Sequence, residues 1–130
     1  MINVLYRGKR KYKNDWVEGL PIIGVFGDLL IQDIINHWDK QYIIDPNSIG
    51  EFTGKEDKNN KKIFEGDIVR IFDKHYPNHK SDYKVYWGDY AWSLISATGD
   101  GDDYGPFTRK FGLPNDVYEV IGNTYNRNDY

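Results

Sequence analysis

The sequence contains no cysteine and only one methionine in 130 residues. A disulfide framework is therefore excluded, and the absence of thiols agrees with a reducing cytoplasm. Apolar runs are short too: the longest, around residues 29–31, is interrupted by Gln32 and Asp33, whereas a helix needs about 20 apolar residues to cross a bilayer. The first residues lack the pattern of a secretory signal. These absences predict a small soluble protein with no membrane contact.

Neither sign of charge is in large excess. Seventeen Lys and Arg stand against 20 Asp and Glu, which gives a formal charge of -3. Phosphate binding depends on an excess of cations, so the overall balance argues against a dedicated nucleic-acid binder. The balance still allows a local basic patch.

Aromatic residues are abundant, at 16% of the chain. Aromatic and β-branched side chains suit a pleated, half-buried surface. Thirteen glycines and five prolines fit a chain with many turns. The composition therefore predicts an all-β protein with room for one core, or one core plus a small appendage.

The first forty residues contain three apolar segments separated by turns. Residues 4–19 have apolar ends around a basic middle, which predicts a β-hairpin. Two apolar runs follow, 20–26 and 29–38, on either side of Gly27-Asp28, a dipeptide suited to a tight reversal. Periodicity alone does not separate strand from helix in the second run. Clustered isoleucines and flanking glycines favour a strand.

Shorter extended pieces lead into the second half. A strand is expected at 41–44 and an extended piece at 49–54. The turn Glu65-Gly66-Asp67 then precedes a strand in which Val69 and Ile71 share one face, because strand side chains alternate.

The remaining strands follow at close spacing. Residues 83–87 and 91–95 predict a hairpin with a glycine in its loop, and residues 118–125 predict a last strand. Several short strands separated by turns indicate an antiparallel barrel or sandwich.

Four blocks of residues form a recognisable combination. They are Tyr6-Arg7-Gly8-Lys9 with Trp16-Val17-Glu18-Gly19; Ile49–Gly54 with Asp57-Lys58-Asn59 and Lys62–Val69; Val85-Tyr86-Trp87 with Trp92; and Val120–Tyr125. Together they resemble the YopX-like family, whose members are carried largely by bacteriophages and prophages. The segments between the blocks, notably 22–42 and 73–82, depart from the family in length and composition.

The resemblance implies an architecture and leaves the activity open. It implies an all-β protein with an N-terminal strand-rich hairpin segment at 1–48 and an SH3-like barrel at 49–130. Together with the lack of cysteine, which agrees with a reducing compartment, a phage-borne protein is expected in the cytoplasm of the bacterial host. No catalytic or binding residue is assigned for the family, so none is carried over.

Two acidic clusters have the residue types of chemical sites. Glu65 and Asp67 could work as an acid and base pair, but Gly66 between them favours a turn that the Asp67 side chain caps. The acidic loop 99–105 resembles the start of a calcium loop. Phe111 stands where an EF-hand has a bidentate glutamate, so we expect a solvated loop and leave cation binding open.

Metal and covalent chemistry have little support. His75 and His79 have the four-residue spacing of metal-binding helices, but Pro77 between them disfavours a helix. No serine lies in a GxSxG motif. The sequence therefore predicts a protein that is not an enzyme and has no cofactor and no metal.

The N-terminal hairpin carries five cations within seven residues, interleaved with aromatic rings. Cations attract phosphates and aromatic faces stack on bases, so the hairpin could hold a single strand of nucleic acid. A solvated loop whose charges discourage edge-to-edge aggregation is the favoured alternative. The residues of the nucleic-acid hypothesis are Arg7, Lys9, Arg10, Lys11, Lys13, Tyr12 and Trp16.

The aromatic content favours a second hypothesis. Twenty-one rings exceed what a barrel of this size is expected to hide, and exposed Trp and Tyr are preferred at protein contacts. Self-association also covers strand edges. The leading prediction is a non-enzymatic phage or prophage accessory protein that forms a homo-oligomer through its N-terminal strands and binds another macromolecule, an unknown protein partner. The alternative is a nucleic-acid-binding module that uses the basic 7–13 hairpin.

Overall fold

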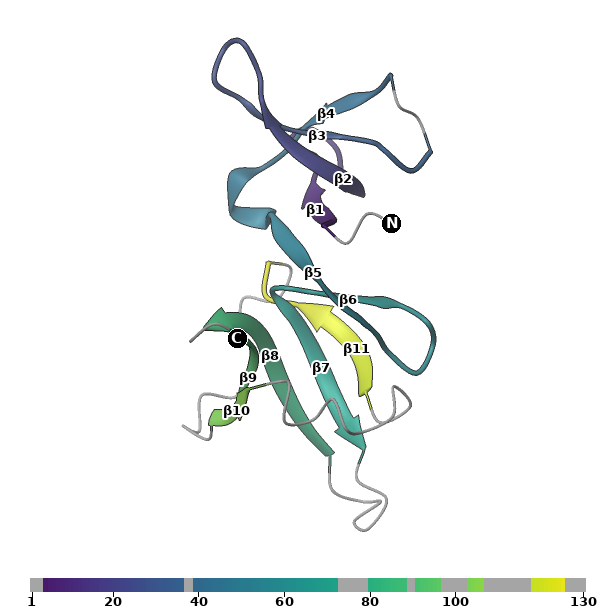
Figure 1. Ribbon diagram of the computed structural model, residues 1–130, viewed down its shortest axis with the longest axis vertical. Coiled ribbons are helices and arrows are strands. Elements are labelled where there is room, and N and C mark those ends of the chain that lie inside the picture. Colours follow the sequence, from purple (N-terminus) through teal and green to yellow (C-terminus); the bar gives the residue numbers. More distant parts are fainter. Residues whose placement is uncertain are drawn as a thin grey trace. The chain divides into compact units, whose positions relative to one another are not determined.

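The computed structural model describes residues 4–36, 39–72, 80–88, 91–96, 103–106 and 118–125. Within these ranges the chain forms antiparallel strands and one short 3-10 helix, η1, with no α-helix. The all-β prediction is confirmed. The elements are β1 (Tyr6–Lys9), β2 (Trp16–Ile23), β3 (Leu29–Gln32), β4 (Gln41–Ile43), η1 (Pro46–Ser48), β5 (Gly50–Glu56), β6 (Lys62–Phe64), β7 (Asp67–Phe72), β8 (Lys80–Gly88), β9 (Ala91–Ser96), β10 (Asp103–Pro106) and β11 (Tyr118–Asn123) (Figure 1).

The chain divides into two compact units, Met1–Phe52 and Thr53–Tyr130. The boundary expected from the sequence, after Ser48, falls at the end of η1. Strand β5 begins in the N-terminal unit and ends in the C-terminal unit. No helix among the described residues is long and apolar enough to span a membrane.

The N-terminal unit is built on a four-strand meander. Strands β1 and β2 form the expected hairpin, with Lys9 opposite Trp16. Strands β2 and β3 form a second hairpin, and β4 pairs with the outer side of β3. The choice of strand over helix for the run beginning at Leu29 is confirmed, because β3 starts there.

The predicted strand at 20–26 extends beyond the end of the observed strand. Strand β2 stops at Ile23 because the next residues form the reversal: the Gly24 amide donates to the Asp28 carbonyl at 2.9 Å. Gly27 has a φ of 88°, a value that favours glycine. Val25 and Phe26 consequently lie in the turn, outside the strand ladder.

The strand expected at 29–38 is also too long. Strand β3 ends at Gln32 because the Asp33 carboxylate accepts hydrogen bonds from the amides of Ile35, at 3.0 Å, and Asn36, at 2.8 Å. An aspartate that binds nearby amides in this way offers the backbone a turn in place of a strand ladder.

Two glycines fix how closely the N-terminal strands approach one another. A Cβ atom at Gly8 would overlap Ile44 and lie 3.0 Å from Ile31 Cδ1, and one at Gly19 would overlap the Gln32 carbonyl. Both isoleucines are almost completely buried. The core of this unit therefore packs directly against the backbone of β1.

The end of β1 also meets the end of β4. Arg10 forms an isolated bridge with Ile44, the Lys11 amide donates to the Ile43 carbonyl at 2.9 Å, and the Asp45 amide donates to the Lys9 carbonyl at 3.0 Å. The meander thus curls until its first and last strands touch.

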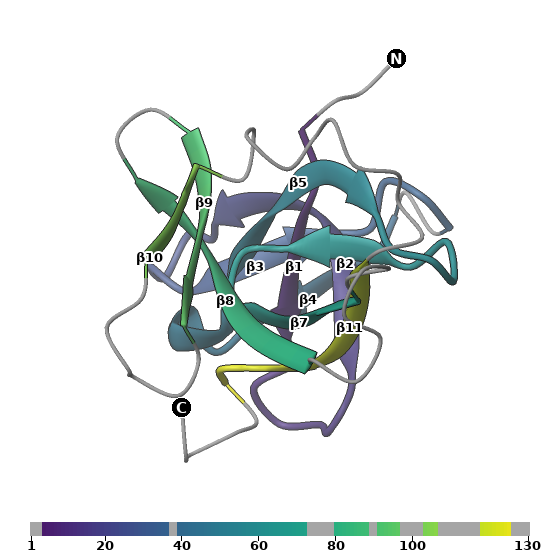
Figure 2. The ribbon, with the colours of Figure 1, turned by 90° about the horizontal axis from the view of Figure 1, so that it is seen from below.

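The C-terminal unit contains a five-stranded sheet in the order β10-β9-β8-β7-β11 (Figure 2). The expected hairpin is confirmed, with Val85 opposite Leu94 and Trp87 opposite Trp92. Val69 and Ile71 face the core as expected. The full core cluster is Ile63, Val69, Ile71, Tyr83, Val85, Leu94 and Tyr118.

The described strands of this sheet do not close into a barrel. Strands β10 and β11 are its two edges, because the three strands β9, β8 and β7 lie between them and no pairing joins them directly. The register shifts between Asp103 and Gly105 in β10 and between Val120 and Gly122 in β11. The closed barrel expected at 49–130 is therefore corrected to an open sheet among the described strands.

A buried aspartate holds the β5–β6 hairpin on β11. Asp57 is 1% exposed. One of its carboxylate oxygens accepts from the amides of Asn59, at 2.8 Å, and Lys61, at 2.9 Å, and the other accepts from the amide of Val120 at 2.9 Å. One side chain thus satisfies a turn and a distant strand together.

We expect Asp57→Ala to lower the free energy of unfolding by about 3 kcal/mol, because three amides lose a charged acceptor in a buried place. Asp57→Asn, which keeps one acceptor oxygen, should lose about half as much. Urea unfolding followed by tryptophan fluorescence measures both values. Asp39→Ala, which removes an exposed carboxylate, is the matched control, and equal stability of Asp57→Ala and Asp39→Ala would contradict the assignment.

Candidate binding surfaces

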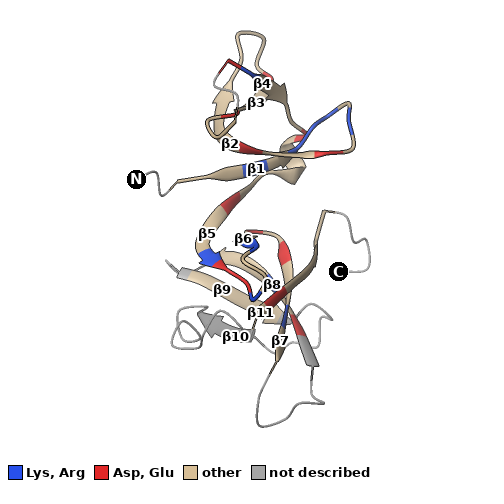
Figure 3. Cartoon of the chain, turned by 90° about the vertical axis from the view of Figure 1, so that its right-hand side faces the viewer, with Lys and Arg blue, Asp and Glu red and all other residues tan. Residues whose placement is uncertain are grey.

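The basic hairpin loop comprises Arg10–Asp15, between β1 and β2. The loop is closed by the Arg10 amide, which donates to the Asp15 carbonyl at 3.0 Å, and is tied to β4 through Lys11. The loop is drawn as the blue, cation-bearing turn of the N-terminal unit in Figure 3. The structure therefore brings the loop cations together at one exposed turn.

The two arginines of this segment are held against aromatic rings. The Arg7 guanidinium lies 4.9 Å from the centre of the Trp16 ring. That of Arg10 lies 4.6 Å from the centre of the Tyr42 ring and 3.3 Å from the Asp15 carboxylate. Cation-π contacts of this kind stabilise the hairpin. The contact with Arg7 occupies a face of Trp16, a ring that the sequence hypothesis assigned to a base, whereas Tyr42 was not part of that hypothesis.

The lysines differ in exposure. Lys9 is half-buried on β1, whereas Lys11 and Lys13 are exposed in the loop. Tyr12 between them is 78% exposed, with the Lys11 ammonium 5.7 Å from its ring centre. The seven predicted contact residues thus form two groups. Lys11, Tyr12 and Lys13 are exposed at the loop tip, whereas the others are partly buried on the strands or at the start of the loop.

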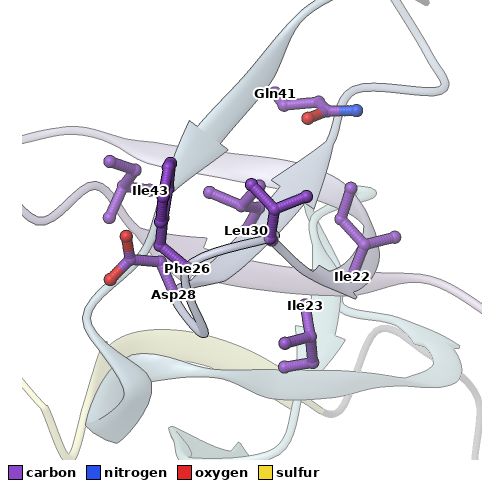
Figure 4. A pocket seen from close by; sticks show the side chains of 9 residues that line it. Ile22, Ile23, Phe26, Asp28, Leu30, Gln41 and Ile43 are labelled. Atoms are coloured by element: carbon purple, nitrogen blue, oxygen red, sulfur yellow. The ribbon is translucent and has the colours of Figure 1, made fainter.

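An apolar groove lies on the outer face of β2, β3 and β4. The register places Ile22 opposite Leu30 and Leu30 opposite Ile43, so these three side chains form one row across the strands. The adjacent row contains Ile31, which points to the core and is fully buried. Because strand side chains alternate, the row of Leu30 faces away from that core (Figure 4).

The β2–β3 turn extends this groove with exposed apolar side chains. Val25 is 94% exposed, Phe26 93% and Ile23 70%. Asp28 and Gln41 supply the polar side chains of the lining. Sequence reasoning missed this site because it placed Val25 and Phe26 inside a strand; the glycines on either side, Gly24 and Gly27, were the available signal for a turn.

The second exposed aromatic site lies on the C-terminal unit. Trp87 is 54% exposed and packs edge-on against Trp92, with ring centres 5.1 Å apart and an interplanar angle of 75°. The two residues face each other across β8 and β9. Trp92 therefore holds an accessible indole in a fixed position.

Of the two acidic candidate sites, the one at Glu65-Gly66-Asp67 is described and has a structural role. Gly66 has a φ of 89°, and the Asp67 carboxylate accepts from the Phe64 amide at 2.8 Å, which is the capped turn favoured from the sequence. The acidic loop 99–105 lies largely outside the described residues, as do His75, His79 and Phe111. Among the described residues no group of three or more His, Cys, Asp or Glu could hold a metal ion.

Lys55 on β5 has a shifted pKa. Burial lowers the pKa of Lys55 from its usual 10.5. Its ammonium lies 5.7 Å from the centre of the Tyr118 ring, the side chain that anchors β11 in the core. This lysine belongs to the packing of β5 on the C-terminal unit.

Fold and surfaces together define an all-β protein of two units with one exposed apolar surface and one exposed basic surface. The family model described as YopX protein matches residues 5–129, which is nearly the whole chain. The chain belongs to the YopX family, as the four sequence blocks implied.

Two further comparisons concern relatives of this chain. No curated protein matches its sequence. Its structure is similar to the crystal structure of protein EF1440 from Enterococcus faecalis, with a TM-score of 0.55, 19% identity and coverage of 100% of both chains. At this identity the likeness shows a shared fold.

Proposed function

We propose that this protein is a non-enzymatic accessory protein of a bacteriophage or prophage, acting in the cytoplasm of the bacterial host. In this proposal it self-associates through the apolar groove of the N-terminal unit and then binds another macromolecule. Membership of the YopX family, whose members are largely phage-borne, supports the phage origin. The row Ile22, Leu30 and Ile43 carries the proposal of self-association.

The chemistry of this row argues for a protein partner. An antiparallel sheet with one solvated face normally alternates apolar and polar residues. Here Ile31 fills the inner face while Leu30 and its neighbours make the outer face apolar as well. Exposed apolar patches of this kind mark interaction surfaces.

A second copy of this chain fits the groove best. Phe26 is almost fully exposed at the rim of the groove, so the same surface carries a protruding ring and a hollow lined by Leu30 and Ile43. Such a surface is self-complementary: a two-fold axis lets each copy place its Phe26 in the groove of the other.

Trp87 supports the proposed binding of another macromolecule. Aromatic side chains are enriched at protein contacts, and its edge-on packing against Trp92 keeps the indole ordered before binding. We assign the contact with a protein partner to this hairpin, β8–β9.

An SH3-like barrel for the C-terminal unit is part of the same proposal. It is supported by the strand order, in which the meander β7-β8-β9-β10 is followed by a last strand, β11, that returns to the free side of the first. Such a sheet is a partly open barrel, and small barrels of this kind serve many unrelated binding functions.

Light scattering at tens of micromolar tests self-association. We expect the wild-type mass to be a multiple of 15.3 kDa. Phe26→Asp should shift the mass to that of one chain. Each ring is worth about 2 kcal/mol at the centre of an interface, and a dimer loses two, so the dimerisation constant should fall roughly 1000-fold.

Tyr12→Ser is the matched control, since it removes an exposed ring outside the groove lining and should leave the mass unchanged. A wild-type protein that is monomeric at these concentrations would refute self-association. Equal effects of Phe26→Asp and Tyr12→Ser would refute the groove as its site.

Capture from phage-infected or prophage-induced cells tests the partner site. We expect the wild-type chain to retain one specific protein, and Trp87→Ser to lose it by roughly 30-fold in affinity, the effect of a central aromatic residue. The Trp87→Ser chain should keep the wild-type mass by light scattering. Undiminished capture by Trp87→Ser contradicts the assignment.

A further inference from the structure

Positive charge is concentrated in one short stretch of the N-terminal unit. Residues 1–52 contain six Lys and Arg, and five of them lie between Arg7 and Lys13, whereas the acidic residues are spread from Asp15 to Glu51. The β1–β2 hairpin carries these five cations and only two carboxylates, those of Asp15 and Glu18, so its net charge is clearly positive. Its loop is the blue turn of the N-terminal unit in Figure 3. A neutral or acidic chain with charge segregated in this way still offers a local site to an anion.

The exposed end of this hairpin combines charge with an exposed aromatic ring, Tyr12, whose centre lies 5.7 Å from the Lys11 ammonium. The rings of Trp16 and Tyr42 are covered by arginine guanidinium groups. Tyr12 is 78% exposed and stands between Lys11 and Lys13, both exposed. The tip thus presents one exposed ring between two exposed lysines in consecutive positions of the chain.

Backbone hydrogen bonds fix the tip on either side of Tyr12. The Lys11 amide donates to the Ile43 carbonyl at 2.9 Å, and the Lys13 amide donates to the Arg10 carbonyl at 3.4 Å. Arg10 lies next to the tip in the chain. Its guanidinium pairs with the carboxylate of Asp15, whose side chain is 55% exposed. Solvent screens such a pair, so the Arg10 guanidinium can donate to a phosphate while it stays on the Tyr42 ring, 4.6 Å from the ring centre. A platform ordered in advance loses little entropy on binding.

We propose that the tip of the β1–β2 hairpin binds single-stranded nucleic acid. One base stacks on Tyr12, and the flanking phosphates contact Lys11, Lys13 and Arg10. A stacking ring needs an unpaired base, because the faces of bases in a duplex are already covered. The same feature disfavours an acidic protein or an anionic membrane, which would use the lysines and leave the ring without a partner. This surface is separate from the apolar groove and does not depend on self-association.

The small number of contacts predicts weak, moderately salt-dependent binding. About three phosphates on a single strand give a slope of log affinity against log salt near -2. Affinity should therefore fall roughly 20-fold between 50 and 200 mM salt.

Fluorescence anisotropy with a labelled oligothymidine of about 15 nucleotides tests this site in the full-length protein. Tyr12→Ala should weaken binding by about tenfold, the effect of losing one stacked base, and Tyr12→Phe should restore it. Lys11→Gln combined with Lys13→Gln should reduce the salt slope to about -1. The control is Lys40→Gln, which removes the cation of residues 1–52 that lies outside the hairpin and should change nothing.

Three outcomes would overturn the proposal. The first is no binding of the oligonucleotide even at low salt. The second is equal binding of Tyr12→Ala and wild type, or of single strand and duplex of the same length, which would reduce the site to bulk electrostatics. The third is binding to anionic phosphatidylserine vesicles in place of the oligonucleotide, which would assign the cations to a membrane surface.

Discussion

The register of the N-terminal meander decides which apolar side chains are buried and which are left for a partner. Leu30 and Ile31 are neighbours in sequence, yet one lines the outer groove and the other is fully buried. The two side chains differ because successive side chains of a strand point to opposite faces. A register shift of one residue would therefore exchange their positions. Gly8 and Gly19 hold the register, because a side chain at either place would collide with β4 or β3.

The two N-terminal surfaces meet at a single residue. The side chain of Ile43 lines the apolar groove, while its carbonyl accepts the Lys11 amide at the start of the basic tip. Strand β4 therefore supports both surfaces, one through its side chains and one through its backbone. A partner seated in the groove and a nucleic acid on the tip would contact opposite sides of the same short strand.

The residues that carry the family resemblance explain why it indicates a fold and no reaction. Asp57 ties a turn to β11, Gly66 adopts a positive φ, and Asp67 caps the turn before β7. Each of these side chains or backbone shapes is needed to join the strands of the C-terminal unit. Of the surfaces proposed for binding, those at Phe26 and Tyr12 lie outside the resembling blocks, whereas Trp87 lies within one of them.

The sequence by itself determined the strand content, the positions of the two clearest hairpins and the basic character of the β1–β2 connection, because alternation, turn residues and charge are local properties. It placed the ends of β2 and β3 too late, since the turn at Gly24 and the Asp33 carboxylate that terminates β3 act through hydrogen bonds that composition does not reveal.

Only the tertiary structure decided that the C-terminal sheet is open and that Ile22, Leu30 and Ile43 form one row. It also decided that arginines contact the rings of Trp16 and Tyr42, whereas Tyr12 is 78% exposed. These facts depend on which strands become neighbours. Neighbours are chosen by packing between residues far apart in the chain.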